Sequence, residues 1–175
     1  MNQRRRAVRA ALLSFRLGGV DGVSVESQKW ATTLYELGWE VRTVAGAGPV
    51  DVLVRGLDFN DEICPALSAV EESVEGCDLI IVENLLSLPL KPAASRVVAA
   101  VLRDRSAVLR HFDLPWQRAR FVQVEGFPPT DPEWRHVVIN RLSQRELSAR
   151  GIDSSVLPPG FSAPGAGRRR HSAVD

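Results

Sequence analysis

The sequence is poor in the residues that build disulfide frameworks and metal centres. Its 175 residues include two cysteines and three histidines. Two cysteines exclude a scaffold held by several disulfides and fit a cytoplasmic location. Cys64 and Cys77 do not have metal-ligand spacing, and the scattered histidines supply no zinc set, so no metal site is expected. The net charge is only +1, which gives no general attraction to nucleic acid or to an anionic membrane.

Long hydrophobic runs are also missing. No apolar segment approaches the roughly 18 residues that a membrane helix needs, and LIIVENLLSLPL is broken by Glu83 and Pro89. The basic and apolar start, MNQRRRAVRAALLSF, is similar to a signal peptide, but Arg9 interrupts it and no small-residue cleavage site follows. We therefore expect a soluble protein without a transmembrane segment, in which residues 8–15 form a first buried strand.

What the sequence does contain is a regular alternation of short apolar runs and helical patterns. The runs predict strands at 8–15, 39–45, 50–54, 78–83, 107–113, 136–140 and 154–158. Helical periodicity predicts helices at 25–37, 63–75, 93–102 and 143–150. Such alternation with short connections predicts an α/β fold, a Rossmann-like, open and mostly parallel sheet with helices on both faces.

The ends of these helices carry recognisable signals. Ser24 is placed to cap the first helix, and Ser143 with Glu146 has the spacing of a capping box at the last one. The helix over 63–75 is expected to bury an apolar stripe that begins at Ile63.

The alternating pattern stops after Pro158. Residues 161–175, FSAPGAGRRRHSAVD, are rich in Pro, Gly, Arg and Ser and have no apolar period. The sequence is therefore divided into one domain, residues 1–160, and a disordered tail, residues 161–175. The three arginines of the tail are interpreted as a solvated basic segment, because no aromatic residues are interleaved with them.

Three glycines lie between the first strand and the first helix, at Gly18, Gly19 and Gly22. In open parallel sheets, ligands bind beyond the carboxyl ends of the strands. Amides at the start of this helix could therefore approach a phosphate or a cluster of sugar hydroxyls, although a tight turn explains the glycines equally well. A GxGxxG motif, an acidic residue after the second strand and a Walker GK[ST] are all missing, which disfavours a nicotinamide dehydrogenase or a P-loop protein.

A second group of polar residues follows the strand that ends in RHFDLPWQR. His111 and Asp113 alternate where the strand ends, so both could face the crevice and hold sugar hydroxyls. Trp116, after Pro115, adds an aromatic platform of the kind used against sugar faces. The alternative interpretation is structural: Asp113 caps the next turn, and His111 and Trp116 simply pack against the protein.

A third group, Glu83 and Asn84, ends the strand DLIIVE. A carboxylate at the end of a buried strand must be solvated in the crevice or paired with a cation, for which Lys29, Lys91 and Arg110 are candidates. Functional and structural interpretations of this group remain equally open.

In chain order, these segments resemble the N-terminal half of a GT-B glycosyltransferase of the family-4 type. The resemblance covers roughly residues 7–161 and is carried by RLGGVDGVSVESQKWATTLYELGWEVRTVAG, DLIIVENLLSLPL, RHFDLPWQR and HVVINRLSQRELSARGIDSSVLPPGF. It implies a hexosyltransferase-like enzyme that transfers a sugar, with retention, from a nucleotide-sugar donor to an acceptor, without a cofactor.

The resemblance also implies roles for the three groups. His111, which would touch the donor sugar, and Asp113 are the catalytic candidates. The residues expected to bind substrates are Gly18, Gly19, Asp21, Gly22, Ser24, Lys29, Glu83, Asn84 and Trp116. Among these, Gly18 and Gly19 would line the donor phosphates.

Two departures from the family pattern shape the functional hypothesis. The element that should read PNG is Pro158-Pro159-Gly160, and the second, nucleotide-binding domain is missing from this sequence. We therefore expect a truncated half-enzyme, inactive alone, whose partners are a donor-binding domain or second chain, the nucleotide-sugar and an acceptor. Peripheral membrane contact stays open, and nucleic acid is not an expected partner. A non-catalytic Rossmann-like binding module is the alternative, and a nucleotide-dependent oxidoreductase is a weaker one.

Overall fold

The first apolar run forms the central strand of the sheet. β1 (Arg9–Arg16) is buried over its six inner residues, as expected for a parallel strand covered on both faces. The computed structural model describes residues 6–160 and pairs β1 with β2 (Glu40–Ala47) and β4 (Leu79–Glu83). The tail predicted for residues 161–175 lies outside the described residues.

Within residues 6–160 the sheet has seven strands, all parallel, in the order β3-β2-β1-β4-β5-β6-β7. The other strands are β3 (Val52–Leu53), β5 (Ala107–His111), β6 (Trp134–Val138) and β7 (Ser154–Val156). The prediction of a Rossmann-like, open sheet is confirmed, and the sheet is parallel throughout. The strand order reverses direction at β1 and β4, which is the switch point where such sheets bind ligands.

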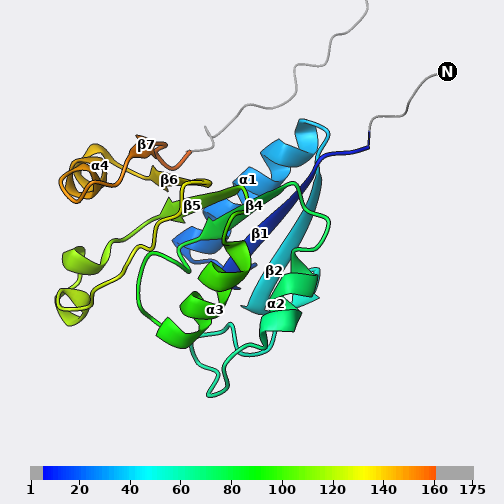
Figure 1. The fold of residues 1–175 in the computed structure, drawn as a ribbon. Helices are drawn as coiled ribbons and strands as arrows, with labels where there is room; N and C mark the ends of the chain where they lie inside the picture. Colours follow the sequence, from blue (N-terminus) through cyan, green and yellow to red (C-terminus); the bar gives the residue numbers. More distant parts are fainter. Residues whose placement is uncertain (1–5, 161–175) are drawn as a thin grey trace, which may run out of the picture.

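Helices connect the strands and cover both faces of the sheet. They are α1 (Gly22–Glu36), α2 (Leu67–Ser73), α3 (Pro92–Leu102) and α4 (Arg141–Ser148), with the short 3-10 turns η1 (Pro115–Gln117) and η2 (Ala119–Phe121) after β5. α1 lies on one face and α2 and α3 lie on the other (Figure 1). Val70 of α2 and Val98 of α3 are fully buried in the main core. A smaller cluster of Leu114, Val138 and Leu147 anchors α4.

The capping residues of α1 and α4 differ from those predicted. Asp21 caps α1, and its Oδ1 accepts the backbone N–H of Ser24 at 3.0 Å. Asn140 caps α4, and its Oδ1 accepts the backbone N–H of Ser143 at 2.8 Å. Each predicted serine is therefore the third residue of its helix, whose amide the capping side chain satisfies.

The second helix begins later than predicted. α2 starts at Leu67, and the side chains of Ile63 and Leu67 are each 48% exposed, so the buried stripe starts only at Val70. The preceding chain is occupied by a tight loop. Gly56 has a φ of +86°, and a Cβ there would lie 2.5 Å from the backbone nitrogen of Pro65, so the two segments of this loop pack closely together.

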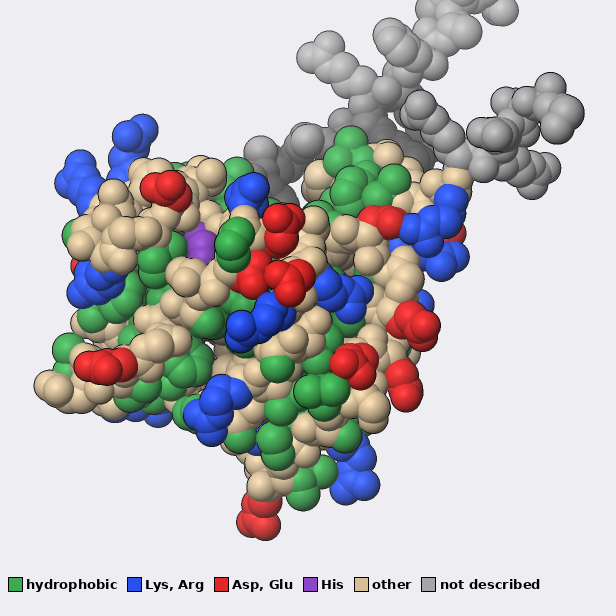
Figure 2. All heavy atoms as spheres, viewed as in Figure 1, with side chains coloured by type: hydrophobic (Ala, Val, Ile, Leu, Met, Phe, Trp, Pro, Cys, Tyr) green, Lys and Arg blue, Asp and Glu red, His purple; other side chains and the backbone are tan. Residues whose placement is uncertain are grey.

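Charges of both signs are interspersed on the face seen in Figure 2, in keeping with the small net charge. Across residues 6–160, no helix has both the length and the apolar character that crossing a membrane requires.

Candidate functional site

The glycine loop after β1 is shaped first by packing. Gly18 has a φ of +77°, and a Cβ at this position would lie 2.5 Å from the ring of Pro49. A larger residue would therefore be strained and would also collide with the next loop. Gly19 and Val20 are exposed, and Val20 is entirely so. The loop thus places exposed backbone at the carboxyl edge of the sheet, where a ligand can approach it.

A carboxylate occupies the start of α1. The side chain of Asp21 accepts the backbone N–H of Ser24 at 3.0 Å and its hydroxyl at 2.8 Å. Burial works to raise the pKa of Asp21, but these hydrogen bonds hold it below the usual value. Negative charge at this helix end repels a phosphate and attracts hydroxyl donors. The loop formed by Gly18, Gly19 and Asp21 is therefore better suited to sugar hydroxyls, and its predicted contact with donor phosphates stays a prediction.

Glu83 is paired with one of its three predicted cations. Glu83 Oε1 lies 2.8 Å from Nη1 of Arg110, and both side chains are at most 2% exposed. The other guanidinium nitrogen, Nη2, lies 3.6 Å from Glu26 of α1. Lys29 pairs with Glu26 at 2.6 Å and also donates to the carbonyl of Gly160. These contacts form a buried ion cluster between the ends of β4 and β5 and the first helix.

Aromatic rings cover the same guanidinium. The Arg110 guanidinium carbon lies 4.2 Å from the ring centre of Trp30 and 5.2 Å from that of Phe112. Despite the nearby Arg110, burial raises the pKa of Glu83 to about 7. Glu83 lies beneath the carboxyl edge of the sheet, where its side chain has no exposed surface.

His111 follows the packing interpretation, and its expected contact with sugar hydroxyls stays a prediction. Its side chain is buried, with Nδ1 2.6 Å from Ser87 Oγ and Nε2 2.9 Å from Nδ1 of His136. Burial, and then the neighbouring His136, lower the pKa of His111 to about 3, so the ring is neutral. The last residue of β5 is thus buried together with the strand, and the sequence pattern alone leaves its direction open. A direct contact between this ring and a donor sugar is therefore not supported by its position.

Asp113 and Asn84 are partly exposed at the carboxyl edge of the sheet. The Asp113 side chain is 31% exposed and pairs with Arg118 at 2.5 Å. Asn84 has a positive φ of 58°, and its Oδ1 accepts the backbone N–H of Phe112 at 3.2 Å. Asn84 therefore fixes the loop after β4 against the loop after β5, while the carboxylate of Asp113 stays accessible.

Trp116 packs against α4 and not beside Asp113 as an open platform. Its Nε1 donates to Glu146 at 3.0 Å, and the guanidinium carbon of Arg150 lies 3.7 Å from its ring centre. These contacts cover the ring, so the packing interpretation describes Trp116 better than sugar stacking.

A cluster at the end of β1 was missed in the sequence. Arg16 pairs with Asp58 at 2.9 Å and lies 4.1 Å over the ring of Phe59. Lys91 donates to the backbone carbonyls of Asp58 and Asp61. The only sequence signal was a basic residue at the end of a buried strand, because the partners lie more than 40 residues away.

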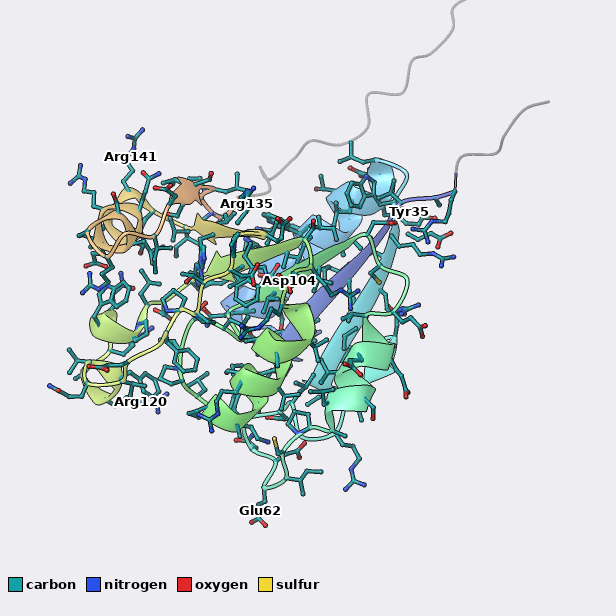
Figure 3. All side chains as sticks on the ribbon, viewed as in Figure 1. Tyr35, Glu62, Asp104, Arg120, Arg135 and Arg141 are labelled. Carbon is teal, nitrogen blue, oxygen red and sulfur yellow. The ribbon has the colours of Figure 1, made fainter. Side chains whose placement is uncertain are left out.

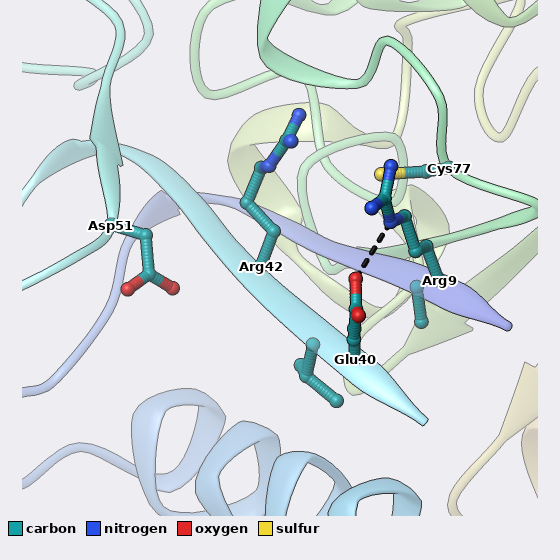
Figure 4. Close-up of a pocket in the computed structure, with 7 residues that line it drawn as sticks. Arg9, Glu40, Arg42, Asp51 and Cys77 are labelled. Atoms are coloured by element: carbon teal, nitrogen blue, oxygen red, sulfur yellow. Dashed lines mark hydrogen bonds and ion pairs between the residues drawn. The ribbon is translucent and has the colours of Figure 1, made fainter. Parts of the chain in front are cut away.

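The cavities lie away from this edge or beneath it. A cavity of about 290 Å³ is lined by Arg9, Glu40, Arg42, Asp51 and Cys77 at the start of β1 and β2 (Figure 4). Arg9 pairs there with Glu40 at 2.7 Å, and Asp51 accepts from Thr43. Its charges are thus satisfied within the protein. Among the described residues, no group of three or more potential metal ligands is gathered in one place.

The α/β fold with its wholly parallel sheet matches the fold class predicted from the sequence. No family model matches the chain. It is 30% identical, over an alignment of 200 residues, to mannosylglucosylglycerate synthase of Thermotoga maritima, covering 90% of this chain and 46% of that protein. It is 26% identical to mannosylglucosylglycerate synthase of Petrotoga mobilis, covering 86% of this chain and 44% of that protein.

This homology confirms the predicted resemblance to a GT-B glycosyltransferase. The chain spans about half the length of the curated relatives that it matches. It is therefore related to a glycosyltransferase over about half of that enzyme.

Proposed function

We propose that residues 1–160 supply one side of the active site of a retaining glycosyltransferase. The observation that carries the proposal is the homology to mannosylglucosylglycerate synthase over nine tenths of the chain. The names of the relatives suggest the reaction, which is transfer of mannose to glucosylglycerate. The donor is a nucleotide-activated mannose, and the reaction needs no cofactor besides these substrates.

The proposed division of labour follows from charge. Transfer with retention passes through an oxocarbenium-like transition state, and a nucleoside diphosphate leaves, so groups that stabilise the diphosphate are essential. Asp21 places a carboxylate at the start of α1, which makes this domain a poor site for the diphosphate. We assign the nucleotide contacts to a separate donor-binding domain, in the same chain or a second one. Residues 1–160 alone are then inactive.

Each predicted site residue has a proposed part in this scheme. The exposed backbone at Gly18 and Gly19 and the carboxylates of Asp21 and Asp113 bind sugar hydroxyls. The other predicted site residues position these groups. Gly22 and Ser24 form the start of α1, and Lys29 and Glu83 belong to the ion cluster. Asn84 and His111 hold the ends of β4 and β5 in place, and Trp116 packs against α4.

The direct test is reconstitution. Residues 1–160 replace the homologous part of the Thermotoga maritima relative, and the fusion is assayed with a nucleotide-activated mannose and glucosylglycerate. We expect a mannosylated product whose anomeric configuration, determined by NMR, equals that of the donor. The 175-residue chain alone should give none. A folded fusion that transfers no sugar from a panel of nucleotide-activated hexoses contradicts the proposal, and an inverted product contradicts the retaining mechanism.

A further inference from the structure

Arg16 is held in a fixed orientation at the carboxyl end of β1. Its Nη2 lies 2.9 Å from Asp58 Oδ1, and its guanidinium carbon lies 4.1 Å from the ring centre of Phe59. The ring of Phe59 in turn packs edge-on against Phe15, with ring centres 5.7 Å apart. An ion pair on one side and an aromatic face on another leave the guanidinium little freedom.

Most donors of this guanidinium are unused. Within residues 6–160, Nη2 alone has an acceptor, and Nε is buried without a partner. An arginine carries five N–H donors in a plane, which match the two oxygens of a carboxylate. The Arg16 side chain is 40% exposed, so a ligand can reach the Nη end of the guanidinium, although Nε is buried.

Asp58 orients Arg16 but is itself committed to the protein. Its side chain is only 12% exposed and also accepts the backbone N–H of Asn60 at 2.9 Å. Lys91 Nζ lies beside it, bonded to the carbonyl oxygens of Asp58 and Asp61. The carboxylate of Asp61 is turned to the backbone N–H of Gly56, at 2.8 Å. The cluster therefore exposes part of the Arg16 guanidinium, while the carboxylate of Asp58 stays largely buried.

The neighbouring loop defines what kind of molecule fits. Arg16 is two residues from Gly18, and the exposed loop and Asp21 that follow favour hydroxyl groups. A ligand with a carboxylate at one end and several hydroxyls beside it satisfies both. Glucosylglycerate, the acceptor named under the proposed function, has this constitution, and the inference rests on that function.

We propose that Arg16 binds the carboxylate of the acceptor and thereby selects an anionic glycoside over a neutral one. Asp58 and Phe59 are positioning residues for this contact. A donor phosphate is the other possible anion, and it is distinguished from the acceptor carboxylate by experiment.

The test is calorimetric titration of the 175-residue chain with three probes: glucosylglycerate, glucosylglycerol, which replaces the carboxylate by a hydroxymethyl group, and GDP-mannose. We expect glucosylglycerate to bind about tenfold more tightly than glucosylglycerol, as one charge-assisted contact supplies. Arg16→Gln should abolish this preference without changing the affinity for glucosylglycerol. Arg16→Lys should retain part of it, and Asp58→Asn should reduce it, because the ion pair that orients the guanidinium is weakened.

The matched control is Arg120→Gln. Arg120 also lies over an aromatic ring, 4.3 Å from the centre of Phe121, but it belongs to η2 at the periphery of the molecule (Figure 3). The control should bind all three probes as the wild type does. Unfolding temperatures of all variants establish that a loss of preference is not a loss of folding.

Three binding results would overturn the inference. Equal weakening of both acceptors by Arg16→Gln would give Arg16 a purely structural role. Selective weakening of GDP-mannose would assign the cation to the donor phosphate. Equal or undetectable binding of the two acceptors by the wild type would show that no carboxylate is recognised. An Arg16-dependent preference together with an inactive fusion would instead refute the proposed function and leave this binding site in place.

Discussion

Glu83 and Arg110 are direct neighbours in the register of β4 and β5, and their side chains form an ion pair of 2.8 Å that is almost completely buried. Glu83 Oε2 and Arg110 Nη2 have no hydrogen-bond partner within the described part of the chain. Removing two charges from water is expensive, and this pair compensates the expense only through its mutual contacts and Glu26. The pair therefore links the ends of β4 and β5. Removing one residue would leave the other buried without a counter-charge and would destabilise the fold.

Breaking this pair should be far more damaging than breaking an exposed one. Arg110→Met leaves Glu83 buried without a counter-charge, and we expect it to lower the free energy of unfolding by about 3–5 kcal/mol. The control, Arg118→Met, breaks the partly exposed pair with Asp113 and should cost about 1 kcal/mol or less. Urea unfolding monitored by circular dichroism measures both. Similar losses in the two variants would contradict the assigned difference in burial.

The raised pKa of Glu83 predicts a specific dependence of stability on pH. Burial raises this pKa from 4.5 to about 7, so the folded state holds the proton more tightly than the unfolded chain. The stability that this proton contributes is fully present below pH 4.5 and is lost as the pH rises through 7. The unfolding free energy of the wild type should therefore fall relative to that of Glu83→Gln across this range. The contribution of the histidines is the same in both proteins and cancels in the difference between their unfolding free energies. A difference that does not change with pH would show that the pKa of Glu83 is not raised.

The histidine pair predicts the opposite dependence at lower pH. Burial lowers the pKa of His111 to about 3 and that of His136 to about 4, from 6.5. The stability from these neutral rings is fully present above pH 6.5 and is lost as the pH falls through 4 and 3. Each ring should add a slope of at most about 1.4 kcal/mol per pH unit. The double variant His111→Gln, His136→Gln should lose this acid sensitivity. If the unfolding free energy of the double variant, measured with urea, falls with decreasing pH as steeply as that of the wild type, the acid sensitivity comes from other groups.

The strand–helix alternation was sufficient to predict the sheet, because parallel strands buried on both faces have a distinctive apolar pattern. The polar strand ends were also identified, and Arg110 was one of three cations considered for Glu83. The choice among them depended on the register Glu83↔Arg110, which no local pattern encodes.

Other features required knowledge of the third dimension. Nothing local distinguishes an inward from an outward direction at the last residue of β5, so the sequence leaves both packing and exposure open for His111, which the structure buries. Arg16 and Asp58 are 42 residues apart and meet only when the loop before α2 folds back onto the sheet. The capping residues were missed by three positions because serines that receive a cap resemble serines that provide one.

The most direct measurement for the central claim is the initial rate of mannose transfer by the reconstituted fusion, compared between two aspartate variants. Asp113 follows the carboxyl end of β5, whereas Asp104, labelled in Figure 3, lies between α3 and the start of the same strand. Both side chains are accessible. We expect Asp113→Asn to lower the rate about ten- to a hundredfold, because a charged acceptor of sugar hydroxyls is lost. Asp104→Asn should leave the rate unchanged. Equal rates in both variants and the parent fusion would contradict a sugar-binding crevice at this edge.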